Sequence, residues 1–150
     1  MITEDTIKVA LDDAQTFVTD GLFVFAVKND ITVRYLMALL NSRLFVFVYR
    51  LLTLEEGRVL AQVKPTTLNQ LPIRTINFAE PVDKWSHDQV VARVTDIITL
   101  NKHLADGKTE HEKMALQRQI HTVDRQIDQL VYQLYGLTAE EVNLVEQATR

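Results

Sequence analysis

The feature that most constrains this chain is a long heptad repeat of apolar residues in its second half. Its members follow one another at intervals of 4, 3, 4, 3 and 4 residues: Leu116, Ile120, Val123, Ile127, Leu130 and Leu134. This spacing places them in one stripe along an α-helix, and that stripe needs a partner to cover it. A similar stripe over Val90–Leu104 can supply the partner. Two such helices joined by a short turn are expected to fold into an antiparallel hairpin.

Local patterns mark the ends of these helices. Ser86–Gln89 reads as a capping box that starts the first one, and Gly107 follows it as a candidate for a left-handed C-terminal residue. Thr109–Glu112 is a second capping box, and Gly136 closes the long helix that it starts. Thr138–Glu141 is a third capping box, so a short final helix is expected after it.

The first third of the chain has the composition of strands. Ile7–Leu11 and Phe17–Val27 are rich in Val, Ile and Phe, and Asp20–Gly21 is a hairpin-turn dipeptide. A helix is expected to begin near Thr32, which suits an N-cap position. Strands followed by a helix predict a small mixed lobe.

Together these elements predict an α+β fold in two parts. A small mixed α/β lobe is expected over residues 1–81, and a helical hairpin with a short C-terminal helix over residues 82–150. The hairpin cannot bury all of its apolar residues by itself, since Val91, Ile98 and Val131 lie beside the main stripes. A third surface is expected to cover them, either the first lobe, a partner chain or another domain.

Composition excludes several classes of protein. The absence of cysteine excludes disulfides and thiolate–metal sites. The richest apolar run, Leu44–Leu54, contains Arg50 and is too short to cross a membrane. Acidic residues near the N-terminus do not suit a signal peptide, so a cytoplasmic protein is expected.

No catalytic or metal site is expected. The four glycines are isolated, so no glycine-rich cofactor loop is present. Four histidines lie in predicted polar helices without the spacing of metal ligands: His87, His103, His111 and His121. Asp124 and Asp128 stand one helical turn apart, and a solvated face or helix–helix salt bridges explain them better than paired catalytic carboxylates.

The net charge of −4 conceals a basic middle segment. From Arg34 to Arg74 six basic residues stand against two acidic ones, whereas from Val82 to Arg150 eight basic residues stand against eleven acidic ones. Phosphate binding depends on local potential, so the middle segment suits nucleic acid, although ordinary surface charge explains it equally well.

Polar side chains in the same segment suit DNA contacts. Asn and Gln can read adenine, Arg and Lys can read guanine, and basic side chains also bind phosphates. A plain polar loop held by buried Leu68, Leu71 and Ile73 is the alternative. The DNA-contacting residues expected from this chemistry are Arg43, Arg50, Arg58, Gln62, Lys64, Asn69, Gln70 and Arg74.

The most specific sequence motif in the chain is the run "QIHTVDRQIDQLVYQLYGLTAEEV" over Gln119–Val142. It resembles the end of type IIG restriction–modification polypeptides and related N6-adenine DNA methyltransferases, where such a run closes the target-recognition region. Three upstream pieces are similar in the same order, over Leu39–Leu44, Leu68–Ile73 and Asp88–Leu104. The resemblance covers nearly all of residues 20–146, and residues 1–19 carry no motif that can be placed.

The resemblance implies a DNA target-recognition module that is not catalytic by itself. The Asn-Pro-Pro-Tyr methylation motif and the S-adenosylmethionine loop of the family are missing, so the chain is expected to be a C-terminal piece of a longer protein. The implied partners are double-stranded DNA and a methyltransferase domain, which would bind the S-adenosylmethionine. The alternative is a helical interaction module without DNA binding of its own, which could form a homodimer through the helices.

Overall fold

A computed structural model describes residues 7–12, 17, 24, 27, 31–53 and 65–149 of the chain. Helices account for 74% of these residues, and none of the described residues lies in a strand. The predicted α+β fold with a mixed α/β lobe is therefore wrong for this part of the chain, which is mostly helical.

The predicted strand over Ile7–Leu11 is wrong, because these residues lie in neither a strand nor a helix in the described part of the chain. The side chain of Asn41 takes the place of a neighbouring strand: its Oδ1 accepts from the Val9 N–H and its Nδ2 donates to the Val9 carbonyl, both at 2.8 Å. Ile7 is buried against the helices. The apolar pattern of Ile7–Leu11 therefore reflects packing against helices and not pairing in a sheet. Most of the Phe17–Val27 segment, with its predicted turn, lies outside the described residues.

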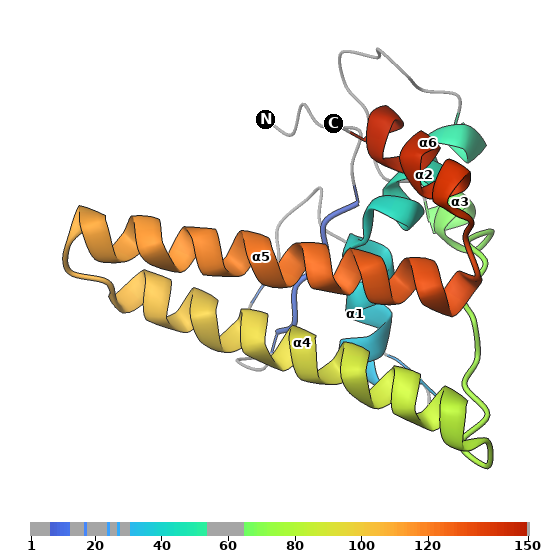
Figure 1. Cartoon of the computed structure of the whole chain (residues 1–150), viewed down its shortest axis with the longest axis horizontal. Coiled ribbons are helices and arrows are strands. Elements are labelled where there is room, and N and C mark those ends of the chain that lie inside the picture. Colours follow the sequence, from blue (N-terminus) through green and yellow to red (C-terminus); the bar gives the residue numbers. More distant parts are fainter. Residues whose placement is uncertain are drawn as a thin grey trace.

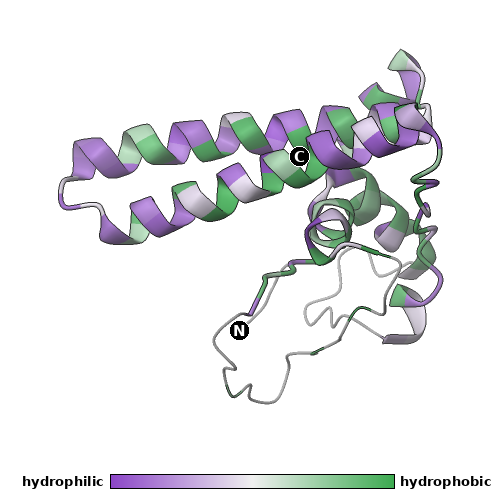
Figure 2. Ribbon diagram, turned by 90° about the horizontal axis from the view of Figure 1, so that it is seen from below, coloured by the Kyte–Doolittle hydropathy of each residue, from purple (hydrophilic) through white to green (hydrophobic). Residues whose placement is uncertain are grey.

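The predicted helical hairpin is present. Helix α4 spans Pro81–Asp106 and helix α5 spans Glu110–Tyr135. They run antiparallel, pack along their lengths and project from one side of the molecule (Figure 1). The apolar stripes face inward near the base of the hairpin, whereas polar residues predominate toward its tip (Figure 2). The heptad spacing therefore predicted this element correctly.

Helix α4 begins earlier than the predicted capping box at Ser86. Pro81 stands at the start of the helix, where its missing N–H costs no hydrogen bond. Ser86 lies inside the helix, and its hydroxyl donates to the Val82 carbonyl at 2.9 Å. Gly107 follows the helix with a φ of −59°, so its predicted left-handed conformation is also wrong.

The other predicted helix ends are confirmed. Thr109 caps α5 by accepting from the Glu112 N–H at 3.1 Å. Gly136 ends α5 with a φ of 68°, in the left-handed region that favours glycine. Helix α6 spans Ala139–Ala148, and Thr138 and Glu141 form a complete capping box at its start.

Three shorter helices come from the first half of the chain. Helix α1 spans Val33–Asn41, α2 spans Arg43–Thr53 and α3 spans Pro65–Leu68. Within the described ranges no single helix is long and apolar enough to cross a membrane; α1 and α2 pass that test only as a pair, and they are bent by 64° relative to each other.

One core joins the first half of the chain to the hairpin. Helix α1 packs on α4, and α2 packs on α5 and α6. Tyr35 and Phe45 of α1 and α2 are fully buried together with Val94 and Val131 of the hairpin. The first half of the chain therefore supplies the covering surface that the hairpin was expected to need. Whether residues 1–81 and 82–150 are separate domains stays a prediction.

Candidate nucleic-acid interface

The corner between α1 and α2 is built around Ser42. Its hydroxyl donates to the Leu39 carbonyl at 2.7 Å and lies 3.4 Å from the Phe45 N–H, which donates to it. One side chain thus ends α1 and begins α2, and it is 1% exposed. This arrangement fixes the direction in which α2 leaves the corner.

Asp128 of α5 holds the first turn of α2. Its Oδ1 accepts from the Arg43 N–H at 2.9 Å, and its Oδ2 lies 3.5 Å from the Arg43 Nε. Burial raises the pKa of Asp128 to about 6, although the Arg43 N–H and guanidinium act in the opposite direction. The predicted helix–helix salt bridge is thus present at Asp128, whereas a solvated face is wrong for this residue.

Arg50 connects α2 to the end of α6. Its Nη1 donates to the Ala148 carbonyl at 2.6 Å. Carbonyl groups in the last turn of a helix lack partners within the helix and carry partial negative charge, so a guanidinium there stabilises the helix end. Arg50, predicted as a phosphate contact, therefore takes part in packing two helices together.

Arg74 is held at several points by the hairpin. Its Nη2 lies 2.8 Å from the Asp83 Oδ1, and its Nη1 donates to the Leu134 carbonyl. Its N–H donates to the Tyr135 hydroxyl and its carbonyl accepts from the Tyr35 hydroxyl, both at 3.0 Å. Burial raises the pKa of both tyrosines, so both stay protonated donors at neutral pH.

Three of the four arginines predicted as phosphate contacts lie in the described part of the chain, and all three have structural partners: Arg43, Arg50 and Arg74. Two of them keep part of the guanidinium side chain in solvent, because Arg43 is 36% and Arg74 40% exposed. Their remaining donors can still face a phosphate, but the contacts described above are all internal to the protein. Their role in DNA binding stays a prediction.

Asn69 and Gln70 lie on the surface directly after α3. The Gln70 Nε2 donates to the Thr66 carbonyl at 3.1 Å, while Leu71 is buried and anchors the segment. The side-chain amide of Asn69 has no partner among the described residues. Three other predicted contacts lie outside the described residues: Arg58, Gln62 and Lys64.

His87 is buried, although the sequence predicts that it lies on a polar helix. Its Nε2 lies 2.8 Å from the Thr32 hydroxyl and its Nδ1 lies 3.0 Å from an Asp88 carboxylate oxygen. Its ring packs on Phe78 and Tyr35. The bond to His87 explains why Thr32 precedes α1 without capping it through its side chain. Among the described residues no cluster of His, Asp or Glu could hold a metal ion.

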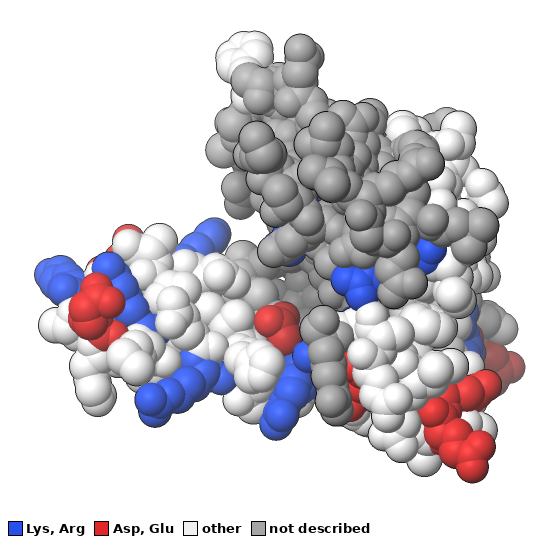
Figure 3. Space-filling model, turned by 90° about the horizontal axis from the view of Figure 1, so that it is seen from above, with Lys and Arg blue, Asp and Glu red and all other residues white. Residues whose placement is uncertain are grey.

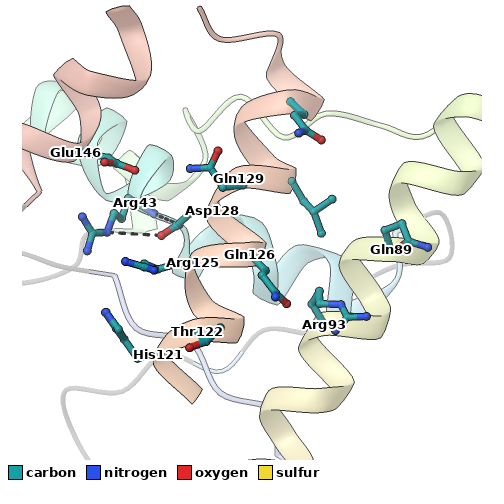
Figure 4. Close-up of a pocket in the computed structure, with 12 residues that line it drawn as sticks. Arg43, Gln89, Arg93, His121, Thr122, Arg125, Gln126, Asp128, Gln129 and Glu146 are labelled. Atoms are coloured by element: carbon teal, nitrogen blue, oxygen red, sulfur yellow. Dashed lines mark hydrogen bonds and ion pairs between the residues drawn. The ribbon is translucent and has the colours of Figure 1, made fainter. Parts of the chain in front are cut away.

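A polar groove of about 840 Å³ runs along the exposed face of α5. Its floor is the middle of α5, with α4 on one side and α2 and α6 on the other (Figure 4). We call it the α5 groove. Its lining is rich in arginine and glutamine: Arg43, Gln89, Arg93, His121, Thr122, Arg125, Gln126, Asp128, Gln129, Leu130, Gln133 and Glu146.

Of the predicted contacts that the structure describes, Arg43 alone lines the α5 groove. The sequence reasoning missed the groove because it treated α5 as a seam and its outer face as ordinary solvated surface. A usable pattern was present: between Arg118 and Gln133 the outward positions of α5 carry mostly Gln and Arg, where exposed helices commonly carry Glu and Lys.

The first part of the chain also matches a known family. Residues 1–73 match the family model of the TaqI-like C-terminal specificity domain. The resemblance to the C-terminal target-recognition region of restriction–modification enzymes is thereby confirmed. No curated protein and no solved structure matches the chain.

The match changes the extent of the resemblance at both ends. It includes residues 1–19, in which no motif could be placed, and it ends at residue 73, before the hairpin. The terminal run Gln119–Val142 therefore lies outside it. Two hydrogen bonds nevertheless connect this run to the first half of the chain. Asp128 accepts from the N–H of Arg43, which lies within the matched residues, and the Tyr135 hydroxyl accepts from the N–H of Arg74, which directly follows them.

Proposed function

We propose that this chain is the DNA target-recognition module of a restriction–modification protein that methylates adenine, and that the module performs no chemistry itself. The observation that carries the proposal is the match of residues 1–73 to a specificity domain. The resemblance of Gln119–Val142 to the end of adenine-specific DNA methyltransferases supports the more specific part of the proposal, that the protein methylates adenine.

The packing supports treating the specificity region and the helical hairpin as one working unit. At the α1–α2 corner, Asp128 accepts a hydrogen bond from the Arg43 N–H. In the segment after α3, the Pro72 carbonyl accepts a hydrogen bond from the Tyr135 hydroxyl at 2.7 Å. Both side chains belong to the terminal run. The hairpin therefore fixes the positions of two segments of the first half, as a rigid support for recognition would require.

Base recognition is assigned to the polar segment around α3. Asn69 and Gln70 are exposed and carry amides that can bond adenine edges. By sequence, Arg58, Gln62 and Lys64 join them. Arg43, Arg50 and Arg74 then act first as supports of the fold, and phosphate contact is a secondary role for them.

Methyl transfer would require a second component. A methyltransferase domain, in the same polypeptide or in a partner subunit, would bind S-adenosylmethionine. The four glycines of this chain are isolated, so its residues do not fit that cofactor. A cytoplasmic location, where such a protein would meet DNA, belongs to the same proposal.

Duplex binding by the 150-residue chain tests the proposal. Fluorescence anisotropy with a labelled duplex of about 30 base pairs is measured near 50 mM and 200 mM salt. We expect binding that weakens by roughly 10³-fold or more if six or more phosphates are contacted. Absence of binding even near 50 mM salt would contradict the proposal.

The alternative, a helical module that only pairs with protein, predicts a different result. It requires the chain to self-associate or to bind a partner through the hairpin without affinity for DNA. Light scattering on the same sample, over a range of protein concentrations, separates the two. A dimer without DNA binding supports the alternative, and a monomer that binds DNA refutes it.

A further inference from the structure

We propose that the α5 groove is a second DNA-contacting surface, which binds backbone phosphates beside the target site. This inference rests on the proposed function and extends it to the helical half of the chain. Apart from Arg43, it assigns DNA contact to residues outside the basic middle segment that the sequence singled out.

The first argument is the cations that meet in the groove. Arg43 comes from α2, Arg93 from α4 and Arg125 from α5, so three helices each contribute one guanidinium. Arg125 is exposed and makes no ion pair or hydrogen bond with another described residue. Arg93 lies on the other side of α5, paired with Asp96 at 2.8 Å (Figure 4). An arginine without a carboxylate partner is free to bind a phosphate.

The second argument is the neutral donors between these cations. Thr122, Gln126, Gln129 and Gln133 follow the floor of the groove at helical spacing, and Gln89 faces them from α4. Hydroxyl and amide groups are common phosphate contacts beside arginine and lysine. They add hydrogen bonds without adding negative charge.

The third argument is where the carboxylates lie. The groove contains Asp128 and Glu146, but Asp128 is buried and already bonded to the first turn of α2. Other acidic residues gather at the hairpin tip and on α6, and Figure 3 shows acidic side chains at both ends of the molecule. At the surface near the middle of α5 this leaves two carboxylates: Asp124, which is exposed but does not line the groove, and Glu146 of α6, which does.

The dimensions favour a chain of phosphates over a single small anion. Groove-lining residues of α5 extend from His121 to Gln133, which is roughly 18 Å along a helix. Arg93 lies on the other side of α5 from Arg43 and Arg125 (Figure 4), so a single phosphate is not expected to contact all three. Successive phosphates of a DNA backbone could.

The test compares two substitutions on the hairpin in the full chain. Arg125→Gln removes the groove guanidinium that has no partner among the described residues, and Lys102→Gln removes an exposed charge outside the groove. Duplex affinity is measured over roughly 50 to 200 mM salt. We expect Arg125→Gln to reduce the slope of log K against log salt by about 0.9, equally for all sequences, and Lys102→Gln to leave it unchanged.

A crosslinking readout gives an independent test. A benzophenone side chain at Gln129, in the groove, is expected to crosslink to bound duplex, whereas the same group at Glu110 near the hairpin tip is not. An unchanged salt slope in Arg125→Gln, together with no crosslink from position 129, would overturn this inference while leaving the proposed function intact. If the unaltered chain binds no duplex, both proposals fail.

Discussion

The contact between Asp128 and Arg43 gives the sharpest prediction about stability. Asp128→Ala removes the acceptor of the Arg43 N–H, which donates to it at 2.9 Å in a partly buried position at the start of α2. The N–H is then left without its partner, and α2 loses the carboxylate at its positive end.

The expected loss is about 1–2 kcal/mol in the free energy of unfolding. Loss of a capping acceptor costs about 1 kcal/mol, and a buried donor without a partner costs about 1–3 kcal/mol. These figures describe the same bond and do not add. The ion pair between Asp128 and the Arg43 Nε adds little to the free energy of unfolding, because the Arg43 side chain is 36% exposed and solvent screens the pair. Relief of the carboxylate's burial offsets part of the loss.

Urea unfolding followed by circular dichroism at pH 7 measures the effect. Asp128→Asn keeps a carbonyl oxygen for the Arg43 N–H, so it is expected to stay within about 0.5 kcal/mol of the unaltered chain. Asp124→Ala is the matched control, because Asp124 lies one helical turn away and accepts no hydrogen bond from a described residue. The reasoning is refuted if Asp128→Asn is as destabilising as Asp128→Ala, or if the control loses as much.

Three further outcomes follow from the structure. Tyr135→Phe removes a hydroxyl that bonds both the Arg74 N–H and a carbonyl, so urea unfolding should show a loss of about 1–2 kcal/mol. Gly136→Ala should cost about 1–2 kcal/mol in the same assay, because the φ of Gly136 is 68° and a Cβ there would meet nothing within 4 Å, so that the backbone conformation alone sets the cost. Because the folded-state pKa of Asp128 is raised to about 6 from 3.8, its protonated form contributes stability below pH about 4 that is lost as the pH rises through 6. The stability of Asp128→Asn relative to the unaltered chain should therefore rise over this window, and a constant difference would contradict the cause assigned to the shift.

The hairpin could be predicted from sequence because its evidence is local and repeated. The apolar stripe of α5, the cap at Thr109 and the left-handed Gly136 act within a few residues, where side-chain spacing decides the structure. The start of α4 was misplaced because Ser86 has a capping pattern, yet Pro81 upstream already suits a helix start.

The first lobe could not be predicted in the same way. Val and Ile in Ile7–Leu11 suit a strand, but burial of Ile7 against helices produces the same composition. The polar partner of this segment, Asn41, lies 32 residues away, and nothing in the local sequence identifies it. Tertiary packing overrides local propensity here.

The candidate site was only partly predictable for a related reason. Residue type indicates that Arg43 or Arg74 can bind phosphate, but it does not reveal that Asp128 or Asp83 already holds the side chain. The α5 groove is lined by Arg43, Arg93 and Arg125 from three different helices, which is a property of the fold.

The central claim, recognition of a DNA target, is tested most directly by selection from random duplexes. The immobilised chain is incubated with duplexes that carry a randomised centre, at roughly 100 mM salt, and the retained molecules are sequenced over successive rounds. Our account predicts enrichment of one consensus several base pairs long, which weakens when Asn69 or Gln70 is replaced by Ala. Retention of duplexes without any sequence preference, or no retention at all, would contradict it.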